Sequence, residues 1–170
     1  MAVKLNPDQH DTPKMAVLPS FFWWGAYMTC AVWAQELSGG HDFLSPGVLV
    51  CLQFRRLWQA LSVAVLWIFL HEGAGSLAFG TSLLFYAGLF VLFFVSQWLL
   101  EPENPLFILT FSLGLAGWLY VVLAGAISFQ EIATRLPDPW PWVFRQWSSY
   151  VLTWAISLFV YRKVMPHGRV

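Results

Sequence analysis

The feature that most constrains this chain is its long uncharged apolar segments. The stretch from Leu106 to Phe129 contains no charged side chain, and neither does the stretch from Phe79 to Leu100. A helix needs about 20 mostly apolar residues to cross a hydrocarbon core roughly 30 Å thick. The runs from Leu18 to Leu37 and from Leu57 to Leu70 with its flanks also approach that length. The sequence therefore predicts an all-α fold, a polytopic bundle of membrane-spanning helices.

Two further segments are shorter. Trp147 to Val164 is bounded by Arg145 before it and by Arg162 and Lys163 near its end, which indicates a well-anchored span. Phe43 to Phe54 carries a Pro-Gly pair near its start and is followed by two arginines. This segment is either a short span or a re-entrant segment buried among the other helices.

Composition excludes several classes of protein. Hydrophobic residues make up 58% of the 170 residues and charged residues 11%, whereas soluble domains carry about a quarter charged residues. The formal net charge of zero gives no electrostatic reason to expect a nucleic-acid partner. Phosphate-binding loops, His-x-x-x-His pairs and Cys-x-x-Cys pairs are all missing from the sequence. We therefore expect a non-enzymatic protein with no catalytic residues, no metal site, no cofactor and no small-molecule substrate.

Basic residues decide between the two readings of the short segment, because cytoplasmic loops are enriched in Lys and Arg. With six spans and both termini inside, seven basic residues lie on the cytoplasmic side and two outside. The inner set is Lys4, Lys14, Arg55, Arg56, Arg162, Lys163 and Arg169, and the outer set is Arg135 and Arg145. Five spans would leave four inside and five outside. The count favours six crossings, with both termini cytoplasmic.

This topology divides the chain into three parts. Residues 1–17 form a cytoplasmic N-terminal tail, residues 18–164 the six-span bundle, and residues 165–170 a cytoplasmic C-terminal tail. The outer loop between the last two spans contains the proline-rich stretch from Leu136 to Trp142, where we expect no regular helix. Tryptophans near the predicted span ends, including Trp23, Trp24, Trp98 and Trp147, are typical of an aromatic belt at the membrane surface.

The candidate functional residues fall into three sets. Small residues permit close helix contacts in lipid, so we expect helix packing or partner binding at Ala74, Ala78, Ser82, Gly114, Gly117 and Gly125. Glycines that tolerate positive φ predict a tight turn between the third and fourth spans at Gly73, Gly75 and Gly80. The polar candidates for the outer face are Glu36, His71 and Glu72. For these three, a solvated helix end, a partner contact and a metal or proton site all remain open.

The order of elements carries a family resemblance. A first span is followed by a short segment opening with Ser45-Pro-Gly, a basic break at Arg55 and Arg56, and a long span that runs into His71-Glu-Gly-Ala-Gly-Ser-Leu-Ala-Phe-Gly80. Nearly the whole chain resembles the rod shape-determining MreD family of bacterial inner-membrane proteins. Gly75, Ser76 and Gly80 fit that family's turn, while His71 stands where an acid is expected and Glu72 follows it.

The resemblance implies a non-enzymatic scaffold of the cell-elongation and peptidoglycan-synthesis machinery in the bacterial cytoplasmic (inner) membrane. Its partners would be membrane lipid, a one-span periplasmic protein of the MreC type and cell-wall synthesis enzymes. Two alternatives stay open. Six short-looped spans also resemble the substrate-binding S component of energy-coupling-factor vitamin transporters, and the tryptophan content fits an accessory subunit of a respiratory membrane complex.

Overall fold

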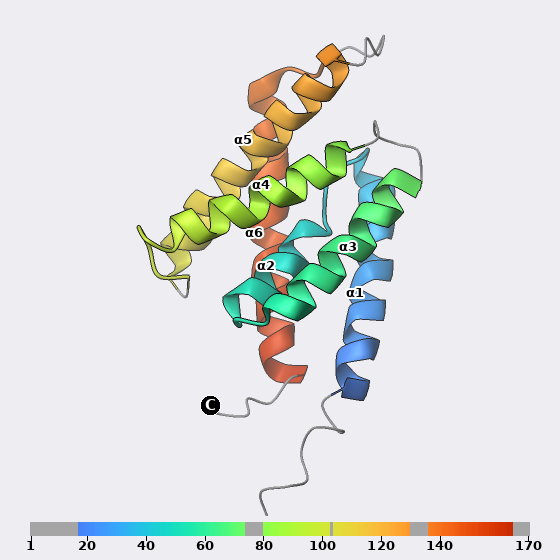
Figure 1. Cartoon of the computed structure of the whole chain (residues 1–170), viewed down its shortest axis with the longest axis vertical. Coiled ribbons are helices and arrows are strands. Elements are labelled where there is room, and N and C mark those ends of the chain that lie inside the picture. The colour runs from blue at the N-terminus through green and yellow to red at the C-terminus, as the bar shows by residue number, and fades with distance from the viewer. Residues whose placement is uncertain (1–16, 74–79, 103, 130–135, 165–170) are drawn as a thin grey trace, which may run out of the picture.

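The structure, a computed structural model, describes residues 17–73, 80–102, 104–129 and 136–164, and every regular element in these ranges is an α-helix. The expected all-α class is therefore confirmed for the described residues. The helices are α1 (Val17–Ser38), α2 (Ser45–Gln53), α3 (Leu57–Gly73), α4 (Thr81–Ser96), α5 (Pro105–Phe129) and α6 (Pro139–Val164) (Figure 1).

The lengths of the helices determine which of them could cross a membrane. Among the described helices, α5 is the one that is both long enough and apolar enough to cross a bilayer, by length and composition. Helices α3 and α4 are apolar but have 17 and 16 residues. Within the described part of the fourth predicted span, Phe79 to Leu100, the helix runs from Thr81 to Ser96, and the chain turns at Gln97 to Leu99.

The largest difference from the sequence-based prediction is the start of α6. This helix begins at Pro139, eight residues before the predicted Trp147, and includes Pro141. The prediction that prolines prevent helix here was wrong. The first turn of a helix has N–H groups without intrahelical partners, so a proline there removes no hydrogen bond. The N–H of Trp142 already donates to the Asp138 carbonyl, at 3.3 Å.

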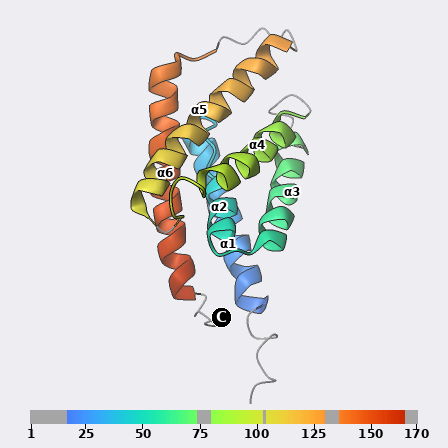
Figure 2. The same ribbon diagram turned by 60° about the vertical axis from the view of Figure 1, so that its left-hand side comes forward.

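The long helices alternate in direction and so share two ends (Figures 1 and 2). We call the acidic end the one where α1, α3 and α5 terminate and α4 and α6 begin; its ionisable residues are Glu36, His41, Asp42, His71, Glu72, Asp138 and Arg145. We call the opposite end the basic end; it carries Arg55, Arg56, Glu101, Arg162 and Lys163. Among the described residues, four of the five carboxylates thus lie at the acidic end and four of the five Lys and Arg side chains at the basic end.

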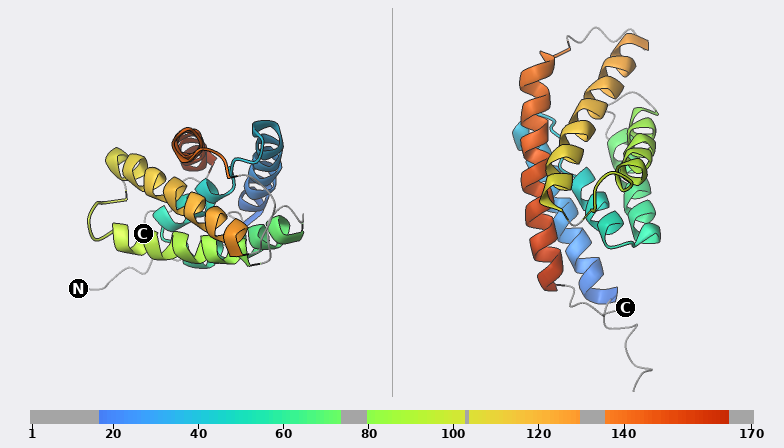
Figure 3. Two further views of the ribbon diagram at one scale, coloured as in Figure 1. Left: turned by 90° about the horizontal axis from the view of Figure 1, so that it is seen from above. Right: turned by 90° about the vertical axis from the view of Figure 1, so that its left-hand side faces the viewer.

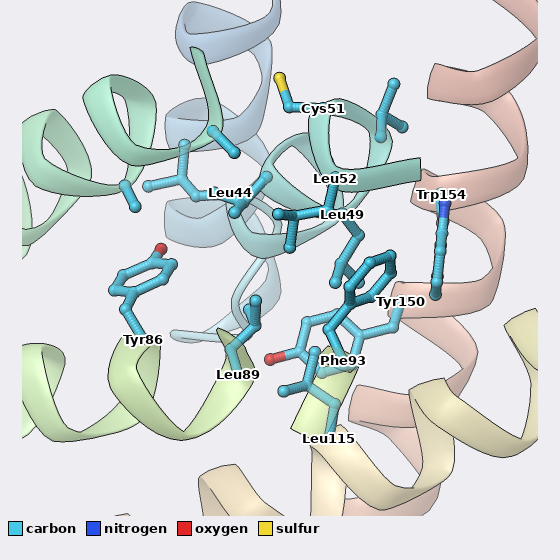
Figure 4. Packing of buried hydrophobic residues seen from close by; sticks show 14 of the residues in the cluster. Leu44, Leu49, Cys51, Leu52, Tyr86, Leu89, Phe93, Leu115, Tyr150 and Trp154 are labelled. Carbon is cyan, nitrogen blue, oxygen red and sulfur yellow. The ribbon is translucent and has the colours of Figure 1, made fainter. Parts of the chain in front are cut away.

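Helix α2 lies in the interior, between α3 and α6 (Figures 1 and 3). The chain leaves α1 through Gly39 and Gly40, whose φ angles of 75° and 91° favour glycine, and then descends into the bundle without regular structure. All eight residues from Ser45 to Leu52 are buried. Figure 4 shows the α2 side chains surrounded by residues of α4, α5 and α6, among them Leu89, Leu115 and Tyr150.

Two glycines allow backbones and rings to approach closely within the chain. A Cβ atom on Gly47 of α2 would lie 2.5 Å from Trp67 and 2.8 Å from Tyr27. A Cβ on Gly88 of α4 would overlap the indole of Trp118 from α5, coming within 2.6 Å of its Cζ2 atom. That indole lies across α4 and donates a hydrogen bond to the Phe85 carbonyl, at 3.3 Å. Gly47 and Gly88 are therefore tight packing positions.

Helix α1 contacts the rest of the chain mainly through aromatic rings. Tyr27 stacks on Trp67 with centroids 5.9 Å apart, and Trp24 meets the same ring edge-on at 6.4 Å. Trp23 lies 6.5 Å from Tyr161 of α6. Trp23 and Trp24 are half-buried and belong to this internal cluster, in contrast to Trp98, which is 91% exposed. Trp23 and Trp24 thus contribute to packing between helices, and their place in an aromatic belt stays a prediction.

Candidate functional site

The most highly bonded side chain in the described structure is Asp42, which lies just before α2 and is 6% exposed. Its Oδ1 atom accepts hydrogen bonds from the backbone N–H groups of Leu44 (2.8 Å) and Ser45 (3.2 Å). Its Oδ2 atom accepts a short hydrogen bond from the Ser45 hydroxyl and one of 2.9 Å from the Tyr150 hydroxyl. Four donors therefore stabilise a carboxylate inside the bundle.

These bonds complete the N-terminus of α2. The first N–H groups of a helix have no intrahelical acceptor and must be satisfied elsewhere. Asp42 accepts two of them, Pro46 has none to offer, and the N–H of Gly47 donates to the Leu44 carbonyl at 3.1 Å. A negative charge at this position also complements the helix dipole. The sequence Asp42-Phe-Leu-Ser-Pro-Gly47 thus builds a buried helix start without unsatisfied N–H groups.

Residues on one face of α6 form hydrogen bonds at both ends of α2. The Gln146 side-chain amide exchanges two hydrogen bonds with the Asp42 backbone, of 3.1 Å and 2.9 Å. Tyr150 binds the carboxylate, and the indole of Trp154 donates to Gln53 Oε1 at 3.2 Å. These three α6 residues are four positions apart, so they line one helix face. At the C-terminal end of α2, the side-chain amide of Gln53 also donates a hydrogen bond of 2.7 Å to the Pro102 carbonyl.

A cavity of about 330 Å³ opens beside Asp42 at the acidic end. Residues from α1, α3, α4, α5 and α6 line it, together with the segment before α2. The lining residues are Gln35, Glu36, Gly39, Gly40, Asp42, His71, Thr81, Ser82, Phe85, Tyr86, Leu119, Leu123 and Trp142. We call this space the acidic-end cavity. Among the described residues that line it, two are carboxylates, one is a histidine and none is a Lys or Arg.

Two hydroxyls in the wall of this cavity have no hydrogen-bond partner. Ser82 Oγ and Tyr86 Oη are buried, and neither bonds to a described residue. The Tyr86 hydroxyl lies near Asp42 and Ser45 without forming a hydrogen bond of normal geometry. Buried polar groups are nearly always bonded, so two such hydroxyls in one cavity wall require an explanation.

The polar residues singled out from the sequence separate in the structure. Glu36 and His71 both line the acidic-end cavity, on α1 and α3. Glu72 instead accepts a hydrogen bond from the N–H of Gly80, at 2.9 Å, and so joins the end of α3 to the start of α4. Gly80 has a φ of 85°, the conformation expected of a turn glycine. Gly73 is the last residue of α3, and its φ is not positive. Gly75 lies outside the described residues.

The helix-packing candidates also separate. Ser82 is buried in the cavity wall, and Ala74 and Ala78 lie outside the described residues. A Cβ on Gly114, Gly117 or Gly125 would meet no atom within 4 Å among the described residues. These three α5 glycines therefore do not mediate close packing within the described chain, and their role in partner binding stays a prediction. Gly47 and Gly88, which do pack tightly, were not on the predicted list.

Sequence reasoning also missed Asp42, Gln146, Tyr150 and Tyr86 as site residues. A signal for Asp42 exists, since an Asp two to four residues before a Pro-Gly helix start commonly binds the first N–H groups. The four-residue spacing of Gln146, Tyr150 and Trp154 marks a polar and aromatic helix face. The hydrogen bonds of Gln146 and Tyr150 to Asp42 join residues 104 and 108 positions apart, so no local pattern predicts them.

The chemistry available at this site is binding through hydrogen bonds and negative charge. Asp42 is fully engaged as an acceptor, and Glu36 is exposed. The described residues contain no group of three His, Cys, Asp or Glu side chains arranged to hold a metal ion. No family model matches the sequence, and neither the curated proteins nor the solved structures contain a match.

Proposed function

We propose that this chain is a six-span scaffold of the bacterial inner membrane, acting in cell elongation and peptidoglycan synthesis through helix contacts with partner membrane proteins. The resemblance to the MreD family motivates the named machinery, with an MreC-type one-span protein and cell-wall synthesis enzymes as partners. The observation that carries the proposal is the open glycine face of α5.

The separation of charge supports a membrane orientation. Arg55, Arg56, Arg162 and Lys163 lie at the basic end, and Arg145 is the basic residue at the acidic end among the described residues. Because cytoplasmic loops are enriched in Lys and Arg, the basic end faces the cytoplasm in this proposal. Both termini then lie inside. Alkaline phosphatase fused after residue 170 should be inactive, and activity there would contradict the orientation.

The position of α2 supports the proposal that the segment from Phe43 to Phe54 crosses the membrane. Its nine residues extend about 14 Å, too short to span a bilayer alone. The irregular residues 39–44 lead from the acidic end into the bundle, and α2 continues toward Arg55 and Arg56 (Figure 1). Non-helical backbone at membrane depth is tolerated where protein buries it and satisfies its polar groups. Asp42 and Gln146 meet that requirement here.

The glycine face of α5 is suited to a partner helix. Helices associate in lipid through close backbone approach, which small residues permit. Gly114 and Gly117 lie on the longest apolar helix that the structure describes, with open space where a side chain would stand. Exposed Leu113 and Val121 flank them and offer apolar contact area. This face combines small residues with flanking apolar ones and is unoccupied within the described chain.

The test replaces one glycine and follows the complex. Gly117→Leu should leave the amount of folded protein unchanged but abolish co-purification of an MreC-type protein or a cell-wall synthase in mild detergent. Gly25→Leu is the matched control, because a Cβ on Gly25 of α1 also meets no atom within 4 Å. Equal co-purification with Gly117→Leu and with the unmodified protein would contradict the proposal.

The acidic-end cavity favours a second function, capture of a small molecule from the outer face as in a transporter subunit. That function predicts partners limited to an ATPase module and a stoichiometric bound ligand. Mass spectrometry of the purified protein under non-denaturing conditions separates the two functions. A cell-wall synthesis partner supports the scaffold, whereas an ATPase partner supports transport.

A further inference from the structure

We propose that the acidic-end cavity is a binding site for an organic ammonium group attached to an apolar body. This inference goes beyond the scaffold function and does not depend on it. It rests on the charge of the cavity, on the two unpaired hydroxyls in its wall and on the apolar residues opposite them.

The charge of the cavity selects a cation. Glu36 and Asp42 contribute carboxylates, and neither forms an ion pair with a described residue. The donors on Asp42 are two N–H groups and two hydroxyls, which stabilise its charge without neutralising it. Arg145 and the basic end contribute no side chain to the lining. A cationic ligand would supply the missing positive charge.

The unpaired hydroxyls select a ligand with N–H donors. Ser82 is 4% exposed and Tyr86 is 2% exposed, and their oxygen atoms have no partner among the described residues. One helical turn separates them on α4, so both face the same side of that helix. An ammonium group with free N–H bonds can donate to hydroxyl oxygens and to the Glu36 carboxylate at once, since Asp42 already has four donors. A quaternary ammonium has no N–H and cannot.

The rest of the lining suits a carbon skeleton. Phe85, Leu119, Leu123 and Trp142 contribute apolar or aromatic surface. A mainly apolar pocket with a few convergent polar groups is the usual form of a small-molecule site, and its volume of about 330 Å³ lies near the lower limit of roughly 300 Å³ for such sites. The ligand could be a free amine or the ethanolamine headgroup of a phospholipid, which carry the same ammonium chemistry.

The experiment compares a matched amine and alcohol on the full chain purified in mild detergent. Phenethylamine at a hundredfold excess over its Kd should raise the melting temperature by about 5–10 °C, while 2-phenylethanol should not. In a parallel arm, nanodiscs containing phosphatidylethanolamine are compared with nanodiscs of phosphatidylcholine. Stabilisation by the free amine alone identifies a soluble ligand. Stabilisation by the ethanolamine lipid alone identifies a headgroup site.

Three variants test the residues. Glu36→Gln should reduce the ligand-induced shift by more than half, since it removes an exposed charge without disturbing packing. The double variant Ser82→Ala with Tyr86→Phe should melt at the same or a higher temperature without ligand, because it removes unpaired hydroxyls, yet lose the shift. Glu101→Gln at the basic end is the control and should retain it. Equal shifts with amine and alcohol, no response in either arm, or a shift preserved in the double variant would overturn the proposal.

Discussion

The hydroxyl of Tyr150 donates a 2.9 Å hydrogen bond to Oδ2 of Asp42, and this bond connects the last helix to the buried start of the second. Gln146, one turn earlier on α6, binds the Asp42 backbone. The bundle is therefore fastened at its centre by polar contacts, in a chain whose interior is otherwise mainly apolar and aromatic. Such networks are specific because each member left without its partner is costly.

Asp42→Ala should strongly reduce stability. The substitution leaves the N–H groups of Leu44 and Ser45 and the Tyr150 hydroxyl without an acceptor, and each orphaned buried donor costs about 1–3 kcal/mol. Thermal unfolding in detergent should show a large drop in melting temperature. Glu101→Ala, at an exposed position between α4 and α5, is the control and should change little. Equal effects of the two substitutions would contradict a role for the Asp42 network.

Gly88→Val should destabilise the contact between α4 and α5. The added side chain would overlap the Trp118 indole and displace its hydrogen bond to Phe85, and such overpacking typically costs about 1–3 kcal/mol. The yield of folded protein after detergent extraction measures the effect. Gly114→Val makes the same change at an open position of α5 and should preserve the yield. A yield that falls only with Gly114→Val would show that the tight position is wrongly assigned.

Arg55→Gly should stabilise the fold. Arg55 follows α2 with a φ of 56°, and a left-handed residue with a Cβ costs about 1–2 kcal/mol relative to glycine. The N–H groups of Arg55 and Arg56 donate to the carbonyls of Leu52 and Cys51, a helix ending that normally uses glycine. The melting temperature should rise with Arg55→Gly but not with Arg56→Gly, which lacks the positive φ. A rise in both variants would point to lost charge repulsion instead.

Glu72→Ala should weaken the turn between α3 and α4 by about 0.5–1.5 kcal/mol, the usual contribution of one hydrogen bond. Its Oε1 atom accepts from the N–H of Gly80, and glutamine can replace it in that role. Glu72→Gln should therefore match the unmodified protein in melting temperature. Should Glu72→Gln destabilise as much as Glu72→Ala, the negative charge and not the hydrogen bond would be the important property.

Much of the fold follows from local sequence. Long apolar runs predicted α1 and α5 almost to their ends, because apolar length alone defines those segments. The sequence-based prediction placed the start of α6 eight residues too late, because it took Pro139 and Pro141 to prevent a helix, whereas both lie in its first turn. The buried network could not be predicted, because Asp42 acquires its partners only when a helix more than 100 positions away packs beside it. Glu36 and His71 were predicted as polar candidates of the outer face, and both line one cavity, but the cavity itself depends on α4 and α5 side chains.

The hydrogen bonds between α6 and the α2 region impose an order on folding during synthesis. Asp42 is synthesised 104 residues before Gln146, so a ribosome adding about 5–20 residues per second leaves it without that partner for roughly 5–20 s. Throughout this interval Asp42 has only the donors of its own segment, the N–H groups of Leu44 and Ser45 and the Ser45 hydroxyl, and lacks Gln146 and Tyr150. The packing of this segment against α6 can form only after the C-terminal helix has been synthesised. A chain truncated before Pro139 should thus leave the segment accessible to cellular proteases.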